Sequence, residues 1–213
     1  MNKPTKKEIS MSTIVPVVIE KSGRGEKSYD MHSRMLKERI VFLNGDVDDD
    51  SAHAIIMQLM YLNASDPEED ITLIINSPGG SVYSGLAIYD MMQAISNDVV
   101  TVVSGIAMSM GCFLASGGAK GKRFSLPNSR IMAHQVSSGT RGTIVDMRVD
   151  LKETEYLNKR LFEIMSANTG KTLKQIVKDC DRDLFLSPQE AVEYGFLDRV
   201  IYNLSDINNG EDE

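Results

Sequence analysis

Apolar runs of β type alternate with amphipathic helical segments along most of the chain. The β-type runs occupy residues 39–45, 71–80, 99–107, 122–127 and 129–135. Helical patterns occupy residues 48–64 and 84–96, and another helix is expected to open at about Ser109. Strands that alternate with helices in this order pair in parallel through right-handed crossovers, so the pattern predicts an α/β fold with a mainly parallel sheet.

The segment at about 143–168 is a longer helical pattern of a different kind. Charged residues interrupt its apolar positions on nearly every turn, which suits the centre of a core poorly. We interpret it as a helix that projects toward another subunit, with a solvated surface helix as the alternative. A capped helix is expected within 186–200, where Ser187 or its neighbour caps, Pro188 lies in the first turn and Gly195 ends the helix.

The composition indicates one soluble domain with tails, because 42% of the 213 residues are apolar and 25% are charged. The net charge of -7 disfavours nucleic acid as a partner, since phosphate binding needs clustered Lys and Arg. No apolar run approaches the roughly 18 residues of a membrane helix, and residues 1–12 lack the apolar centre of a secretion signal. We therefore expect a cytoplasmic protein without membrane contact. The acidic tail 205–213 is expected to be disordered.

The two cysteines, Cys112 and Cys180, match no metal-binding spacing and indicate no disulfide framework. We expect small packing residues at both positions and no metal site. A reactive Cys112 is the alternative, because this residue lies one turn from Ser109 in the expected helix.

Two of the predicted strands end in turns that can carry chemistry. In "NSPGGSV", Gly79 and Gly80 expose backbone N–H groups to an anion, although an ordinary turn has the same residues and the Lys-Ser/Thr of a P-loop is missing. Ser109 follows the next strand and is either a helix N-cap or a nucleophile whose oxyanion the N–H of Met110 stabilises. Its spacing from Gly105 is not that of the G-x-S-x-G elbow, so the α/β-hydrolase fold is not indicated.

A serine nucleophile needs a base and an acid that orients it. His32 and His53 lie in charged segments and are expected to be solvated, whereas His134 ends a predicted strand at the same sheet edge as Ser109. His134 is therefore the candidate base. Asp181 and Asp183 precede the apolar run "LFL", and Asp183 is the candidate acid because it lies closer to that run.

Several segments of the chain resemble the ClpP family, the proteolytic subunits of ATP-dependent Clp proteases. They are "SPGGSVYSGLAIYD", "GIAMSMGCFLASGGAKGKRFSLPNSRIMAHQ", "DRDLFLSPQEAVEYGFLD" and the amino-terminal "VPVVIEKSGRGEKSYDMHSRMLKERIVFL". The resemblance covers about residues 13–202. It implies a serine endopeptidase with Ser109 as nucleophile, His134 as general base and Asp183 as orienting acid. It also implies an oxyanion hole formed by the N–H groups of Gly80 and Met110.

The resemblance further implies a crotonase-type fold of repeated β-β-α units with a protruding handle helix at about 143–168. Residues 32–204 would form the peptidase domain, residues 13–31 an axial-loop region, and residues 1–12 a cleaved leader or a disordered tail. Two stacked heptameric rings would meet through the handles, with Asp181 and Arg182 in ring contacts. A hexameric AAA+ unfoldase would bind the ATP and feed in unfolded protein or peptide substrates, so no cofactor is expected here.

The chain departs from the family pattern after His134. The family usually continues with a proline and two glycines, whereas Val136 and Ser138 stand here in place of a proline and a glycine. Ring stability and substrate preference are the properties that this departure affects. A substrate is expected to lie extended beside the strand after Gly80 and the segment after His134. The alternatives are a crotonase-fold enzyme acting on acyl-CoA and a regulatory subunit with little catalysis.

Overall fold

The computed structural model describes residues 16–23 and 25–207 of the chain. The leader or tail expected at residues 1–12 lies outside the described residues, as do residues 208–213 of the acidic tail. The chain divides into two compact units between Ile40 and Val41. No helix in the described part of the chain is both long enough and apolar enough to span a membrane.

The amino-terminal unit contains a β-hairpin and a short helix that the apolar pattern did not predict. Strands β1 (Val17–Ser22) and β2 (Gly25–Asp30) pair antiparallel, and helix α1 spans Met31–Lys37. Asp30 caps α1 by accepting a hydrogen bond from the backbone N–H of Ser33. Arg34 of α1 donates one hydrogen bond to Glu20 of β1, so a side-chain contact connects the helix to the hairpin.

The larger unit is built on a mainly parallel sheet, as the alternating pattern predicted. Its strands are β3 (Ile40–Val47), β4 (Ile71–Gly80), β5 (Val99–Met108), β6 (Arg123–Ser125), β7 (Arg130–Ala133), β8 (Leu184–Leu186) and β9 (Arg199–Val200). The order is β3-β4-β5-β6-β9, and β7 pairs with both β5 and β8. The contacts of β5 with β4, β6 and β7 are parallel, whereas β7 and β8 are antiparallel.

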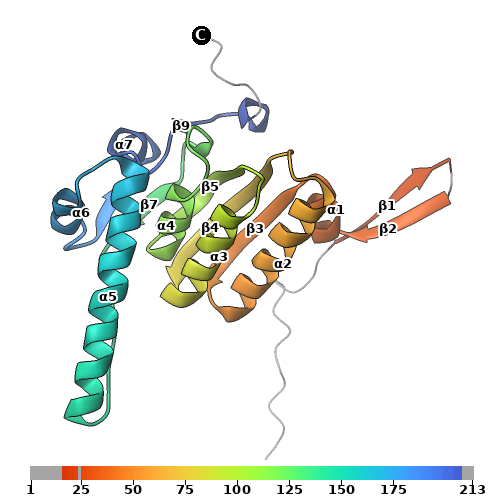
Figure 1. Cartoon of the computed structure of the whole chain (residues 1–213). Helices are drawn as coiled ribbons and strands as arrows, with labels where there is room; N and C mark the ends of the chain where they lie inside the picture. The colour runs from red at the N-terminus through yellow and green to blue at the C-terminus, as the bar shows by residue number, and fades with distance from the viewer. Residues whose placement is uncertain (1–15, 24, 208–213) are drawn as a thin grey trace, which may run out of the picture. The chain divides into compact units, whose positions relative to one another are not determined.

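In the larger unit, helices pack against the sheet (Figure 1), and many apolar side chains of both are buried. They are α2 (Asp49–Ser65), α3 (Val82–Ala94), α4 (Met110–Ser116), α5 (Ile144–Thr169), α6 (Leu173–Asp179) and α7 (Pro188–Tyr194). Strand β4 alternates buried and less buried residues, and its Leu73 and Ile75 are fully buried, as are Leu59 of α2 and Ile88 of α3. Burial of these side chains supplies the main favourable term for folding.

The boundaries of α7 agree with the predicted capping signals. Ser187 accepts a hydrogen bond from the N–H of Glu190, and the Glu190 side chain accepts one from the N–H of Ser187, which makes a capping box. Pro188 is the first helical residue, and Gly195 ends the helix with a φ of 102°. Glycine suits this position because it adopts a positive φ without steric cost.

Helix α5 extends beyond the sheet in the larger unit (Figure 1), as expected for the segment at 143–168. Its buried residues all lie in its carboxyl-terminal half: Leu157, Leu161, Phe162, Ile164 and Met165. In the first half, Val145 is 69% exposed and Val149 is 63% exposed. Exposed apolar side chains at such spacing are typical of a surface that another molecule covers.

The prediction that the tail is disordered from residue 205 was wrong for its first three residues. Leu204–Ile207 forms a 3-10 helix, and Ile207 packs against a small cluster that contains Val100, Phe124 and Ile201. Ile207 supplies an apolar anchor that the acidic composition of the segment obscured, and Arg199 also donates a hydrogen bond to the carbonyl of Asp206.

Candidate active site

The pairing of β5 with β7 brings Ser109 and His134 to one edge of the sheet. Met108, the last residue of β5, is in register with Met132 of β7. The backbone N–H of Ser109 donates to the carbonyl of Met132 at 2.8 Å. Because the strands are parallel, the residues that follow them emerge at the same edge. The sheet therefore places the hydroxyl and the imidazole side by side.

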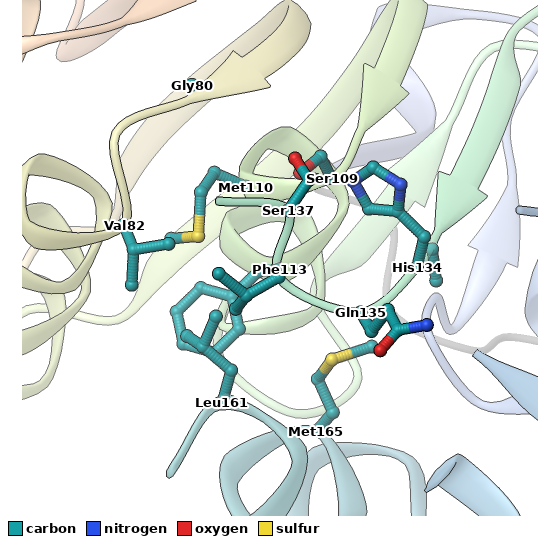
Figure 2. Close-up of a pocket in the computed structure, with 12 residues that line it drawn as sticks. Gly80, Val82, Ser109, Met110, Phe113, His134, Gln135, Ser137, Leu161 and Met165 are labelled. Carbon is teal, nitrogen blue, oxygen red and sulfur yellow. Dashed lines mark hydrogen bonds between the residues drawn. The ribbon is translucent and has the colours of Figure 1, made fainter. Parts of the chain in front are cut away.

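Ser109 has a backbone conformation that is rare for residues other than glycine, with φ 52° and ψ -118°. It occupies the N-cap position of α4, but its side chain makes no capping hydrogen bond. Its Oγ lies instead 2.9 Å from Nε2 of His134, and Figure 2 shows the two side chains pointing toward each other. The Ser109 hydroxyl thus does not cap α4, although the residue stands at the N-cap position. A strained backbone at such a residue is typical of functional sites.

The other ring nitrogen of His134 faces Asp183. The distance from Nδ1 to Oδ1 is 3.0 Å. This contact arises because β7 and β8 are antiparallel and pair Ala133 with Leu184, which places the residue after β7 beside the residue before β8. The imidazole side chain is 24% exposed and the carboxylate 55% exposed, so solvent reaches the pair from the carboxylate side.

The remaining charged candidates are exposed side chains. Asp181 is exposed and forms an ion pair at 3.8 Å with the exposed guanidinium of Arg182. His32 and His53 are exposed, as their charged surroundings indicated. The carboxylate that contacts His134 is therefore Asp183 and not Asp181.

The glycine turn at the end of β4 packs directly on Ser109. A Cβ added at Gly79 would lie 2.7 Å from the carbonyl oxygen of Met108 and 2.7 Å from Cβ of Ser109. A Cβ added at Gly80 would lie 2.2 Å from the carbonyl oxygen of Val47. Both glycines have positive φ angles, of 98° and 150°. No other residue fits this turn without displacing the backbone on which it packs.

Met110 begins α4, immediately after Ser109. The first N–H groups of a helix have no acceptor within the helix and carry part of its positive end. A Cβ at Gly79 would also approach the N of Met110 to 2.9 Å. The backbone of the glycine turn and the start of α4 thus lie next to each other beside the Ser109 side chain.

A small pocket of about 50 Å³ adjoins these groups. Its apolar lining includes Val82, Met110, Phe113, Leu161 and Met165, and its polar lining includes Ser109, His134 and Gln135. Leu161 and Met165 come from α5 and close the side opposite Ser109 (Figure 2). An apolar pocket with a few convergent polar groups is typical of a site that binds a small ligand or a side chain.

Both cysteines are buried and unreactive packing residues. Cys112 is 1% exposed and Cys180 is fully buried. Burial raises the pKa of the Cys112 thiol, with a further contribution from Cys180. Burial also raises the pKa of Cys180 to about 11, with a contribution from Asp179. A protonated, inaccessible thiol is a poor nucleophile, so the alternative of a reactive Cys112 is wrong.

Gln135 was not singled out from the sequence, although it connects the segments that carry His134 and Asp183. Its backbone N–H donates to the carbonyl of Cys180 at 2.9 Å, and its Nε2 donates to the carbonyl of Asp181 at 2.9 Å. A glutamine after a predicted strand gives no signal of such a role, because its partners lie more than forty residues away in sequence.

A hydroxyl, an imidazole and a carboxylate in hydrogen-bonded series beside a helix N-terminus form the arrangement of a serine hydrolase. The fold that presents it is α/β, with a mostly parallel central sheet. A sequence model of the Clp protease family matches residues 23–203, which is most of the chain. The chain therefore belongs to the Clp protease family, and it is a serine protease of the Clp type.

Proposed function

We propose that this chain is a serine endopeptidase subunit in which Ser109 is the nucleophile, His134 the general base and Asp183 the acid that orients the histidine. The observation that carries the proposal is the continuous series of two contacts, of 2.9 Å and 3.0 Å, from hydroxyl to imidazole to carboxylate. With the proton of the neutral imidazole on Nδ1, facing Asp183, Nε2 is free to accept the proton of the hydroxyl.

The reaction begins when Oγ of Ser109 attacks the carbonyl carbon of a peptide bond. The carbonyl oxygen becomes an oxyanion, which the N–H groups of Gly80 and Met110 stabilise by hydrogen bonds. His134 then passes its proton to the leaving amine, and an acyl-enzyme ester remains on Ser109. A water molecule, activated by the same imidazole, hydrolyses the ester and regenerates the hydroxyl.

The strand expected after Gly80 is not present, because β4 ends at Gly80 and helix α3 begins at Val82. The substrate therefore lies extended across Ser109, between the end of β4 at Gly80 and the segment after His134. Main-chain hydrogen bonds along both edges bind the backbone and leave sequence preference to the pockets. The apolar pocket beside Ser109, with Phe113 and Leu161 in its lining, receives an apolar side chain next to the cleaved bond. An acyl-CoA substrate is disfavoured, because that chemistry does not need the Ser109–His134 contact.

The proposed working form is two stacked heptameric rings that enclose the active sites. The exposed apolar residues in the first half of α5, such as Val145 and Val149, provide a surface for ring–ring contacts. Asp181 and Arg182 are both exposed and available for contacts with another subunit. The β1–β2 hairpin is the proposed axial region, where a hexameric AAA+ unfoldase docks, hydrolyses ATP and delivers unfolded chains.

Val136 and Ser138 follow His134 in this proposed cleft. The N–H of Val136 donates to Oδ1 of Asn158 at 2.9 Å, so this segment is bound to α5 at its start. Replacement of the family's proline and glycine therefore changes a segment that touches both the substrate cleft and the handle helix.

The experiment that tests the proposal is Ser109→Ala, assayed with a short fluorogenic peptide that needs no unfoldase. We expect cleavage to fall by about 10⁴-fold or more, because the groups of such a site act as a unit. A fluorophosphonate should label the wild-type protein, and peptide mapping should locate the adduct at Ser109. Sedimentation should show that Ser109→Ala assembles as the wild type does. Ser116→Ala removes another serine hydroxyl from α4, one that bonds to the carbonyl of Phe113, and should retain activity.

Full cleavage by Ser109→Ala, or a fluorophosphonate adduct at another residue, would overturn the assignment. An intact ring with no cleavage by the wild-type chain would instead support the alternative of a regulatory subunit.

A further inference from the structure

Ser77 is a buried polar residue just before the glycine turn, and its hydroxyl accepts a hydrogen bond within that turn. Its side chain is fully buried, and Oγ accepts from the backbone N–H of Gly79 at 3.1 Å. The residue between them, Pro78, has no N–H to donate. The register of β4 with β5 shifts between Ile75 and Ser77, so the chain departs from regular strand geometry where the hydroxyl makes this bond.

The bond fixes the peptide unit that immediately precedes the one carrying the N–H of Gly80. Gly79, whose N–H donates this hydrogen bond, packs against Met108 and Ser109 with no room for a side chain. On the far side of the turn, the N–H of Ser81 donates to the carbonyl of Val47 at 2.7 Å. The peptide unit that carries the N–H of Gly80 is therefore flanked by two peptide units whose N–H groups are hydrogen-bonded.

Ser77 also contacts the helix that carries the second N–H group. A Cβ added at Gly111 would lie 2.8 Å from the carbonyl oxygen of Ser77 and 3.3 Å from its Cβ. Gly111 follows Met110 in the first turn of α4. One buried residue thus lies against both of the backbone segments that carry the proposed oxyanion donors, Gly80 and Met110.

We infer that Ser77 is a positioning residue for the oxyanion hole: its hydroxyl holds the Gly79 peptide so that the N–H of Gly80 points at the developing negative charge. This inference rests on the proposed function, since it assumes that Ser109 attacks a carbonyl there. The Ser77 hydroxyl bonds to the N–H of Gly79 and not to Ser109 or His134, so it would act through the geometry of the turn. A donor must be aligned with the oxyanion of the transition state rather than with the ground-state carbonyl, so loss of the hydroxyl affects kcat more than KM.

The test compares Ser77→Ala and Ser77→Cys with the wild type in peptide cleavage. Cysteine fills the same position with a slightly larger atom but is a weak acceptor, whereas alanine leaves the position empty, so the pair separates the hydrogen bond from packing. Both variants should lower kcat by about 10-fold, less than the 10²–10³-fold cost of a deleted donor, and leave KM within about twofold. Their affinity for a peptide boronate, which forms a tetrahedral adduct, should weaken by about the same factor as kcat.

Ser129→Ala is the matched control. Ser129 is also buried, and its hydroxyl accepts from the N–H of another glycine, Gly105, at 3.2 Å and donates to the carbonyl of Val103 at 3.1 Å. Its loss should cost comparable stability without the tenfold fall in kcat.

Three results would overturn the inference. Wild-type kcat in both Ser77 variants would show that the hydroxyl is not needed. Wild-type kcat in Ser77→Cys alone would assign the effect to packing volume. Equal losses in Ser129→Ala would assign it to general destabilisation. Failure of the proposed function itself is distinguishable, because Ser109→Ala would then cleave as fast as the wild type.

Discussion

Replacement of Asp183 by asparagine tests the proposed orientation of His134 without changing the size of the side chain. In the wild type, the carboxylate lies 3.0 Å from Nδ1 and stabilises the positive charge that the imidazole acquires when it takes the hydroxyl proton. Asparagine removes the negative charge. Its amide can also donate to Nδ1, which leaves the proton on Nε2 and prevents that nitrogen from accepting from Ser109.

The exposure of the pair sets the expected magnitude. Two unit charges about 4 Å apart interact by about 1 kcal/mol in water and about 4 kcal/mol near a protein surface. Because Asp183 is 55% exposed and His134 is 24% exposed, we take an intermediate value of about 2 kcal/mol. That corresponds to about a 30-fold loss in kcat from charge alone. The wrong tautomer of His134 in the variant reduces kcat further. The upper bound for the total loss is roughly 10⁴-fold, which is the cost of removing the charge of a buried carboxylate at this position of a triad.

The assay is steady-state cleavage of a short fluorogenic peptide, with kcat and KM measured separately. We expect kcat to fall by at least about 30-fold while KM stays within about twofold, because the imidazolium forms only during the reaction. The control is Asp179→Asn, which changes a nearby carboxylate that accepts from Gln175 and Tyr194 and not from His134. A kcat for Asp183→Asn within about threefold of the wild type would refute the reasoning.

Two further predictions concern stability and thiol reactivity. Burial raises the pKa of the Asp198 carboxyl, but the hydrogen bond and charge of Arg123 outweigh burial, so the net pKa is lowered. This stabilisation is present above the unfolded-state pKa of about 3.9 and is lost as the pH falls through the lower folded-state pKa. Asp198→Asn should therefore lower the free energy of unfolding by about 3 kcal/mol near neutral pH, measured by urea titration with far-UV circular dichroism, and a difference that persists unchanged in acid would contradict the mechanism. For the thiols, burial raises the pKa of Cys180 to about 11, so iodoacetamide should modify both cysteines only after denaturation, and rapid alkylation of the folded protein would argue against their burial.

The long elements could be predicted because their apolar patterns are repeated over many residues. Strands β4 and β5 have 10 residues each, and α2 has 17, so one face of each element shows its period clearly. Strands β8 and β9 have 3 and 2 residues, too few for any period. The β1–β2 hairpin escaped prediction for a different reason, since β2 is exposed along nearly its whole length and has no apolar face.

Residue type alone did not decide two features of the site. Ser109 could be a nucleophile or an N-cap, and either Asp181 or Asp183 could be the acid that orients His134. Serine before a helix is equally typical of a cap, and Asp181 and Asp183 stand two positions apart in the same segment. The resemblance to a known family favoured one answer, but only the coordinates show which atoms meet. The supporting contacts of Ser77 and Gln135 gave no signal at all.

Local sequence patterns were sufficient to predict the α/β class, the strand ends that carry glycine, serine and histidine, and the caps of α7, because each depends on neighbours within a few residues. Which of those residues approach one another depends on how the strands pair. The parallel register of β5 with β7 places Ser109 beside His134, and the antiparallel register of β7 with β8 places His134 beside Asp183. Pairing between strands joins residues far apart in the chain, and no local pattern records the register in which they meet.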